Sequence, residues 1–320
     1  MRTLLHRAAA AALLMLGALG AQAQGYPTKP IRFIITTAPG GGTDGIGRML
    51  ADALSATLKQ PVVPDNRAGA SGMIGADALA RSAPDGYTLA ILQNVHTSNP
   101  AFYRKLPYDT LKDFSAIAPV ATSPLVLVAA TGTGVGTVQQ LIALGKREPQ
   151  RLSFATAESS SRLAVAQMAE ATGLPMAAVP YKGTGPAVSD VAAGHVNFSV
   201  TTMASALPFK GTGKLNFVAV LDRERSPFLP EVPTLVEQGL SGVEARGWWG
   251  LFGPAHLPEP LVARLNDAIR STLRTPQAQE RLRHFSATPW VGTAQELDAF
   301  VRAEVPAVQH LARKAGIEAE

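Results

Sequence analysis

The chain of 320 residues contains no cysteine. It therefore has no disulfide framework, no thiolate metal site and no cysteine for lipid attachment. Blocks of basic residues are also missing, because lysine and arginine are scattered among the acidic residues. Without Arg2 and Arg7 of the N-terminal segment, the formal net charge falls by two, from +5 to +3. A charge this small and dispersed gives no support to nucleic-acid binding.

Several enzyme motifs are absent as well. There is no Gly-x-Ser-x-Gly nucleophile elbow, and the run from Gly69 to Gly72 has the wrong spacing for one. No Lys-Ser or Lys-Thr pair follows the glycines near residue 40, which excludes a Walker phosphate loop. The histidines beyond residue 24 are widely spaced and form no His-Glu-x-x-His motif, so we predict no metal site. These histidines are His96, His195, His256, His284 and His310.

The N-terminus has the three regions of a cleavable secretory signal. Arg2 and Arg7 precede an alanine and leucine run through Leu19, and Ala21-Gln-Ala23 follows. A membrane anchor is the alternative, but the apolar run is short for spanning a bilayer and ends in a small-x-small cleavage pattern. We therefore predict that residues 1–23 are removed and that the mature protein is soluble in a bacterial periplasm.

About three hundred residues remain, more than one hydrophobic core usually serves, so we expect two lobes with a cleft between them. Strand-like and helix-like segments alternate, which predicts an α/β fold. The pattern restarts near Pro124, and a strand near residue 247 leads back to the first lobe. We predict a first lobe from residues 24–123, a second from 124–246, and a return to the first over 247–320.

The expected elements follow from apolar runs and helix boundary signals. The strands are one that starts at Ile31, then Pro61–Pro64, Thr88–Leu92, Leu125–Ala129, Leu152–Thr156, His195–Val200, Leu215–Leu221 and Val243–Phe252. The helices are one that starts after the glycines near residue 42, then Met73–Arg81, Val138–Arg147, one from Ser161 to Ala171, Ala187–Ala193, Leu261–Leu273, Gln277–His284 and Ala294–Ala315.

The segment from Ile31 to Leu50 is the most informative part of the chain. It reads as a buried strand, a glycine loop and a helix start in immediate succession. Unpaired N–H groups of a first helical turn and the positive end of the helix dipole can hold a carboxylate or phosphate without a charged side chain. The candidate residues are Gly40, Gly41, Gly42, Thr43 and Asp44.

The same glycines formally match a dinucleotide fingerprint, Gly40-x-Gly42-x-x-Gly45, with Asp65 at about the right distance for a ribose contact. Three observations oppose a nicotinamide or flavin site. Pro39 precedes the first glycine, Asp65 lies in a proline-flanked turn, and the export signal lacks a twin arginine. We expect no cofactor.

Three further candidates each have two interpretations. Asp44 is either a helix N-cap or a partner for a ligand hydroxyl, ammonium or bridging water. The serines Ser159, Ser160 and Ser161 either cap a helix or contact a ligand. Trp248 and Trp249 cannot both face one side of a strand, so one of them should point to a cleft or a lobe interface.

Several motifs follow one another along essentially the whole mature chain. They are Ala38-Pro-Gly-Gly-Gly-Thr-Asp44, Asn66-Arg67, Ala83-Pro-Asp-Gly-Tyr-Thr-Leu89, Ser98-Asn-Pro-Ala101, Leu106-Pro-Tyr-Asp109, Val179-Pro-Tyr-Lys-Gly-Thr-Gly-Pro-Ala187, Glu231-Val-Pro-Thr234 and Gly247-Trp-Trp-Gly250. Together they resemble the Bug/TctC family, the periplasmic solute receptors of tripartite tricarboxylate transporters.

The resemblance implies a two-lobed, type II-like periplasmic binding protein with a central sheet in each lobe, flanking helices and a hinge. It implies no enzymatic activity, a monomer, and membrane transporter subunits as partners. A small carboxylate would be held by backbone amides and ordered water, from Gly40 to Asp44 in one lobe and from two loops in the other. The full set of expected ligand-binding residues adds Ser71, Asn94, His96, Asn99, Ser159, Ser160, Ser161, Lys182, Gly183, Thr184, Gly185, Pro186, Thr201, Thr202 and Trp248.

The chain departs from the family pattern in the second lobe. Thr201-Thr202 replaces a common Asp-Asn pair, Arg162 replaces a common histidine, and Ala157 to Ser161 replaces a glycine-rich loop. Loss of the aspartate removes a partner for a ligand amino group, so we predict a carboxylate without an ammonium, a dicarboxylate or an aromatic acid. The competing hypothesis is an exported hydrolase or lyase that uses His96, Asp44 and a cleft serine. A scaffold or adhesion module is disfavoured, because glycine loops cost conformational entropy.

Overall fold

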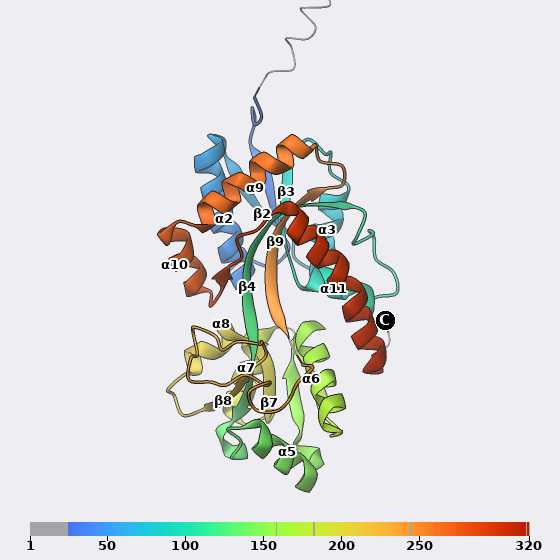
Figure 1. Cartoon of the computed structure of the whole chain (residues 1–320), viewed down its shortest axis with the longest axis vertical. Coiled ribbons are helices and arrows are strands. Elements are labelled where there is room, and N and C mark those ends of the chain that lie inside the picture. The colour runs from blue at the N-terminus through green and yellow to red at the C-terminus, as the bar shows by residue number, and fades with distance from the viewer. Residues whose placement is uncertain (1–24, 158, 182, 244, 318, 320) are drawn as a thin grey trace, which may run out of the picture.

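The computed structural model describes residues 25–157, 159–181, 183–243, 245–317 and 319, and the predicted signal peptide lies outside them. The molecule is elongated, with two lobes stacked along its longest axis (Figure 1). Both lobes are mixed α/β structures, as the sequence predicts. None of the helices within the described ranges is long and apolar enough to cross a bilayer.

The elements divide between the two lobes. The upper lobe of Figure 1 contains β1 (Ile31–Ile35), α2 (Gly42–Leu58), β2 (Val62–Asn66), α3 (Met73–Ala80), β3 (Thr88–Gln93), α4 (Val95–Phe102), the first part of β4 (Phe114–Ala130), β9 (Arg246–Pro254), α9 (Glu259–Leu273), α10 (Pro276–His284), β10 (Thr288–Pro289) and α11 (Ala294–Lys314). The lower lobe contains the rest of β4, α5 (Val138–Arg147), β5 (Ser153–Thr156), α6 (Ser159–Thr172), β6 (Ala177–Pro180), α7 (Thr184–Ala193), β7 (Phe198–Thr202), α8 (Met203–Ala206) and β8 (Leu215–Val220). Short 3-10 helices lie at Ala70–Gly72, Thr131–Thr133, Pro149–Arg151 and Leu207–Phe209.

One sheet runs through both lobes in the order β2-β1-β3-β9-β4-β7-β5-β6, and β8 and β10 pair with β4. β1 lies parallel between β2 and β3, and β5 lies parallel between β6 and β7. The long strand β4 connects the lobes, because it pairs with β9 up to Pro124 and with β7 and β8 from Leu125 onward. The lobes are therefore connected through β4 and the start of β9.

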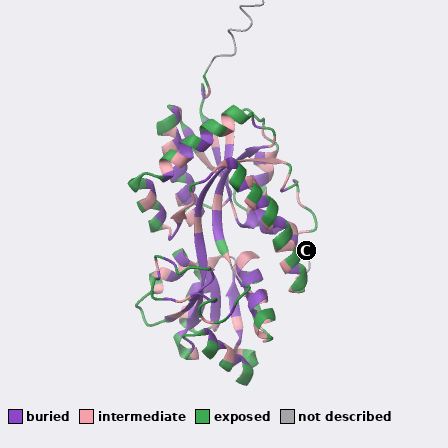
Figure 2. Cartoon of the chain, viewed as in Figure 1, coloured by how far each residue is buried: buried purple, intermediate pink, exposed green. Residues whose placement is uncertain are grey.

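In each lobe the sheet is covered on both faces. In β1, Ile31, Phe33 and Ile35 pack with residues of α2 and α9, whereas Ile34 packs with residues of α3 and α11. This period of two, with apolar residues on both faces, explains why the strand reads as a continuous hydrophobic run. The lower lobe has its own pair of core clusters around β4, β5 and β7. Figure 2 shows the result, with buried strands inside and exposed residues on the outer sides of the helices.

The expected elements are confirmed within a few residues except for one strand, and α4, β6, α8 and β10 were not expected. β4 begins at Phe114 instead of Leu125, because register shifts on either side of Ala118 and Pro119 let the strand accommodate proline. The helix α4 was not expected at all. The polar residues from His96 to Asn99 are buried, and Pro100 lies inside the helix, so it has no amphipathic pattern.

Gly45, the last glycine of the formal dinucleotide fingerprint, has a packing role. A Cβ atom at this position would lie 2.0 Å from Cζ of Phe285, which follows α10. We therefore expect Gly45→Ala to lower the free energy of unfolding by about 1–3 kcal/mol, as overpacking does in other cores. Urea denaturation measures this.

Gly42 is the matched control for this substitution. It lies in the first turn of the same helix, and a Cβ there would meet no atom within 4 Å. Gly42→Ala should change stability by less than about 0.5 kcal/mol. Equal stability of both variants would contradict a packing role for Gly45.

Candidate functional site

The candidate site lies where strand ends of the two lobes face each other. α2, α3 and α4 start after β1, β2 and β3 in the upper lobe, and α6, α7 and α8 start after β5, β6 and β7 in the lower lobe. Ligands of open α/β sheets commonly bind beyond the carboxyl ends of the strands. A hydrogen bond of 3.0 Å from Asn94 Nδ2 to Ser160 Oγ joins the starts of α4 and α6 across this gap.

The first-lobe glycine loop is open to solvent. Gly41 is the N-cap of α2, with φ −88° and ψ 173°, and no side chain among the described residues caps the helix. Gly40 adopts φ +94°, a conformation that favours glycine. Positions 40, 41 and 42 have no atom within 4 Å of an added Cβ. The N–H groups of this helix start are thus available to an anion.

The buried carboxylate of Asp44 holds this loop in place by hydrogen bonds. Asp44 is 5% exposed, and its carboxylate accepts hydrogen bonds from the N–H of Gly40 at 3.0 Å, Asn66 Nδ2 at 2.8 Å and Arg48 Nε at 3.0 Å. Burial alone would raise the pKa of Asp44, but the hydrogen bonds from these three residues lower it. The N-cap interpretation of Asp44 is wrong, because Gly41 is the N-cap.

The side chain of Thr43 connects the loop to the sheet by hydrogen bonds. Its hydroxyl donates to Gln93 Oε1 at the end of β3 and accepts a 2.8 Å hydrogen bond from Trp249 Nε1. Trp248 points to the other side of β9, is fully buried, and donates to Glu304 instead. The expectation that the two tryptophans face opposite ways is confirmed. The choice of Trp248 for the cleft is not supported, since Trp249 is the one that reaches the loop.

Ser71 belongs to a tight turn at the cleft. Gly69, Ala70, Ser71 and Gly72 all have positive φ, between 46° and 124°. Two of these are not glycine, a costly conformation that surrounding contacts must maintain. The carbonyl of Ser71 accepts from Asn99 Nδ2 at 3.1 Å, and its hydroxyl lies 2.9 Å from the hydroxyl of Tyr103.

His96 has the surroundings of a core histidine. It is 3% exposed, and its ring centroid lies 4.7 Å from that of Phe114 and 5.7 Å from that of Tyr108. Burial lowers the pKa of His96 to about 3, so the ring is neutral at ordinary pH. This placement opposes its use as a general base with Asp44, because neither side chain is exposed to a substrate.

The three serines at the start of α6 make different contacts. The Ser161 hydroxyl accepts a 3.2 Å hydrogen bond from the N–H of Ala157, just before α6. Ser160 contacts Asn94 across the lobes, and Ser159 lines a pocket between them. Contact with a ligand stays a prediction for all three.

The start of α7 resembles that of α2. Gly183 is its N-cap, and no side chain in the described ranges caps it. Gly185 and Pro186 are exposed, whereas Lys182 lies outside the described residues. The Thr202 hydroxyl donates to Ser205 at 3.1 Å, and Ser205 donates to Thr184 at 2.7 Å, linking the starts of α7 and α8. Ser205 was missed by sequence reasoning, and Thr201 is buried at 1% exposure.

A pocket of about 160 Å³ lies between the lobes. Of the expected site residues, it brings together Ser71 and Ser159. Its other lining residues were not expected: Phe102, Tyr103, Thr156, Ala157, Arg162, Pro180 and Tyr181. Sequence signals existed for four of them, since Pro180 and Tyr181 belong to a family motif and Ala157 and Arg162 are departures from the family pattern.

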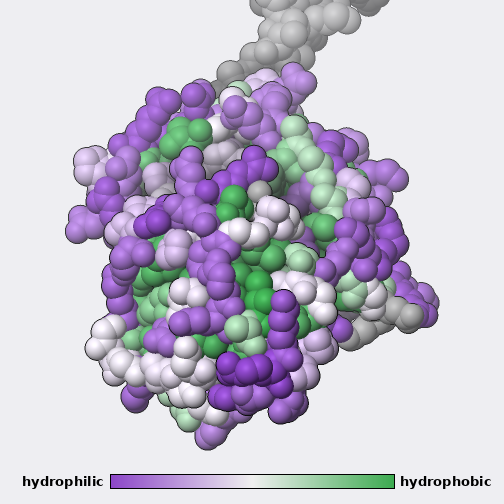
Figure 3. Space-filling model, turned by 60° about the horizontal axis from the view of Figure 1, so that its bottom comes forward, coloured by the Kyte–Doolittle hydropathy of each residue, from purple (hydrophilic) through white to green (hydrophobic). Residues whose placement is uncertain are grey.

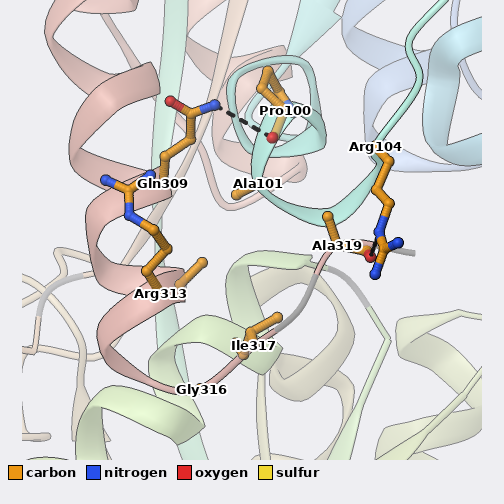
Figure 4. Close-up of a pocket in the computed structure, with 9 residues that line it drawn as sticks. Pro100, Ala101, Arg104, Gln309, Arg313, Gly316, Ile317 and Ala319 are labelled. Atoms are coloured by element: carbon orange, nitrogen blue, oxygen red, sulfur yellow. Dashed lines mark hydrogen bonds between the residues drawn. The ribbon is translucent and has the colours of Figure 1, made fainter.

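Other hollows lie apart from this pocket. One of about 220 Å³, also between the lobes, is lined by Asn94, Ser160 and Glu304 among others. Another of about 490 Å³ adjoins the end of α11, where Gln309 Nε2 donates to the carbonyl of Pro100 at 3.3 Å (Figure 4). That hollow contains none of the expected site residues. On the face shown in Figure 3, hydrophobic residues gather near the centre and hydrophilic residues surround them.

No group of three or more histidine, aspartate or glutamate side chains that could hold a metal ion occurs in the part of the chain that the structure describes. The groups described above at the cleft are backbone N–H groups, hydroxyls, aromatic rings and Arg162. Backbone N–H groups and a guanidinium can hold an organic anion by charge-assisted hydrogen bonds.

Comparisons with known proteins agree with this geometry. The family described as the tripartite tricarboxylate transporter family receptor matches residues 46–317. Protein BugT of Bordetella pertussis is 34% identical, over 91% of this chain and 90% of its own length. The solved structure of the periplasmic binding protein BugD is 31% identical with a TM-score of 0.80, covering 92% of this chain and 100% of that one. Rpa4515 of R. palustris with adipate is 30% identical with a TM-score of 0.84, again covering 92% and 100%.

A family match over most of the chain, relatives aligned along nearly their whole length, and a shared two-lobed fold lead to one assignment. The chain belongs to the receptor family of the tripartite tricarboxylate transporters, the Bug/TctC periplasmic binding proteins.

Proposed function

We propose that the protein captures a small organic acid between its lobes and delivers it to the membrane subunits of a tripartite tricarboxylate transporter. One observation carries the proposal. α2 and α7 start at the cleft, from different lobes, with glycine N-caps and no capping side chain among the described residues. The solved relative that holds adipate supports a carboxylate as the ligand.

The two helix starts suit the two sides of an anionic ligand. A hydrogen bond from a backbone N–H to a carboxylate is charge-assisted and stronger than a neutral one. A ligand that contacts both lobes favours the closed arrangement, and a membrane partner can recognise that state.

We place the lobe boundaries at residues 123/124 and 246/247, close to where β4 changes partner strands and where β9 begins.

Export to the periplasm with cleavage near Ala23, and a monomeric state, complete the proposal. The family and its solved relatives are solute-binding receptors, which supports binding without turnover. The buried, neutral His96 gives a hydrolase no accessible base.

Mass spectrometry of small molecules that co-purify with the protein tests the function: a carboxylic acid recovered unchanged and in stoichiometric amount is expected. Conversion of the acid into a product by the purified protein would contradict it.

We also expect the ligand to lack an ammonium group, because Thr201 and Thr202 stand at the end of β7 where an acidic partner would be needed. Isothermal titration calorimetry should compare succinate with aspartate, glutarate with glutamate, and 3-phenylpropanoate with phenylalanine. In each pair that binds, the acid without an ammonium should bind at least about tenfold more tightly, since an unpaired ammonium would be desolvated. Tighter binding of the amino acids would overturn this expectation.

A further inference from the structure

The walls of the 160 Å³ pocket between the lobes combine three aromatic rings with polar groups. Phe102 and Tyr103 come from the upper lobe, and Pro180 and Tyr181 come from the lower lobe. Polar groups reach the same pocket from Ser71, Thr156, Ser159 and Arg162. A cavity of about 150 Å³ lined by apolar groups holds one benzene molecule. The pocket thus has the size of a single aromatic ring.

Both tyrosine hydroxyls are engaged within their own lobes. The Tyr103 hydroxyl lies 2.9 Å from Ser71 Oγ, in the turn with positive φ angles. The Tyr181 hydroxyl donates a 2.7 Å hydrogen bond to Asp190 Oδ2, and this bond raises the pKa of Tyr181. Because each hydroxyl has a partner, each ring is anchored, and the rings are the parts left to contact a ligand.

The charge distribution favours a ring over a second carboxylate in this pocket. Arg162 is the cationic residue among the residues that line it, and its guanidinium already lies over the ring of Phe102, 5.7 Å from the centroid. Aromatic faces carry partial negative charge, so a carboxylate placed against them would lose hydration, and among the lining residues it could gain an attractive charged partner only in Arg162. An aromatic ring would instead gain offset-stacked or edge-to-face contacts with the tyrosines.

We propose that Tyr103 and Tyr181 form an aromatic subsite that closes on a planar ring, so that the preferred ligands are aromatic carboxylates. The inference rests on the proposed function, since the carboxylate itself is assigned to the helix starts of the two lobes. Because the two rings come from different lobes, a bound aromatic ring would link them and add to the stability of the closed state.

Calorimetric titrations with four acids of similar size test the subsite: benzoate, cyclohexanecarboxylate, heptanoate and adipate. Cyclohexanecarboxylate is the matched control, because it has the same number of carbon atoms as benzoate but a ring that is neither planar nor aromatic. The wild-type protein should bind benzoate at least about tenfold more tightly than the other three. Tighter binding of adipate or cyclohexanecarboxylate would overturn the proposal.

Substitutions of the two tyrosines test whether their rings cause the preference for benzoate. Tyr103→Ala and Tyr181→Ala should weaken benzoate binding about tenfold or more and change adipate and heptanoate binding by less than about threefold. Tyr103→Phe and Tyr181→Phe retain the rings and should keep benzoate binding within about threefold, which separates the ring from the hydroxyl. Equal weakening of all four acids in the alanine variants would contradict an aromatic subsite. Adipate binding without any preference for benzoate would reject the subsite alone, whereas no binding of any carboxylate by folded wild-type protein would reject the proposed function as well.

Discussion

Gly41→Trp is expected to abolish carboxylate binding while leaving the protein folded. Gly41 precedes α2 with φ −88°, which any residue adopts, and an added Cβ would meet no atom within 4 Å. The fold therefore tolerates a side chain there. A tryptophan, however, would occupy the space in front of the uncapped helix start where the anion is proposed to bind. Calorimetry should show at least about 100-fold weaker binding, or about 3 kcal/mol.

Gly185→Trp makes the same test in the other lobe, since Gly185 in α7 also has open space around an added Cβ. Gly132→Trp is the matched control. Gly132 has the same open surroundings but lies in the 3-10 helix after β4, away from the starts of α6, α7 and α8. All three variants should keep a melting temperature within about 2 °C of the wild type, because surface substitutions are usually neutral. Normal binding by the two loop variants would place the carboxylate site elsewhere.

The carboxyl group of Glu304 is expected to make stability depend on pH. Glu304 lies on α11 and lines the 220 Å³ cavity between the lobes. Its Oε2 accepts hydrogen bonds from Thr97 Oγ1 at 2.6 Å and Trp248 Nε1 at 2.8 Å. Burial raises the pKa of Glu304 to about 7, against the smaller opposing effects of those two bonds and of Arg246.

The raised pKa of Glu304 makes its contribution to stability fall as the pH rises. Because the folded protein holds the proton more tightly than the unfolded chain, whose glutamate pKa is about 4.3, the folded state binds more protons between these values. The contribution of Glu304 to stability is fully present below about pH 4, falls as the pH rises, and is lost above about pH 7. At about 1.4 kcal/mol per pKa unit, the ionised group costs up to roughly 3 kcal/mol at pH 8.

Glu304→Gln removes the charge but keeps an oxygen that can accept from Thr97 and Trp248. The variant should be more stable than the wild type by up to roughly 3 kcal/mol at pH 8, with the difference shrinking towards zero near pH 4. Urea denaturation of both proteins across this range measures the difference, in which contributions from the other titrating groups cancel. A difference that stays constant with pH would show that Glu304 has an ordinary pKa.

Secondary structure was predictable where side chains alternate in character along a short stretch. Ile31 to Ile35 and the helix that follows read clearly, because Ile46, Leu50, Leu54 and Leu58 repeat at helical spacing on one face. α4 was not predictable, since its buried residues are polar and their partners come from other segments. Asn94 bonds to Ser160, and Thr97 bonds to Glu304, over 60 residues away in the chain in each case.

The candidate site was predictable only in part, for the same reason. The glycine loops could be found because a strand, glycines and a helix start are contiguous in the chain. The pocket could not, because Tyr103 and Tyr181 lie on different lobes and meet only after folding. The tryptophan pair was predictable in one respect only. Adjacent residues of any strand face opposite sides, but which tryptophan faces the loop depends on how β9 is placed between β3 and β4.

The sequence by itself determined the α/β class, the family and the two helix starts that point to an anion, because each of these is carried by residues adjacent in the chain. Only the tertiary structure decided that Asp44 faces inward, that Trp249 rather than Trp248 approaches the glycine loop, and that two tyrosines share a pocket. It also decided that Glu304 is buried, which raises its pKa to about 7. These features depend on distances and on exclusion of water between segments far apart in the chain, and such quantities exist only once the chain has folded.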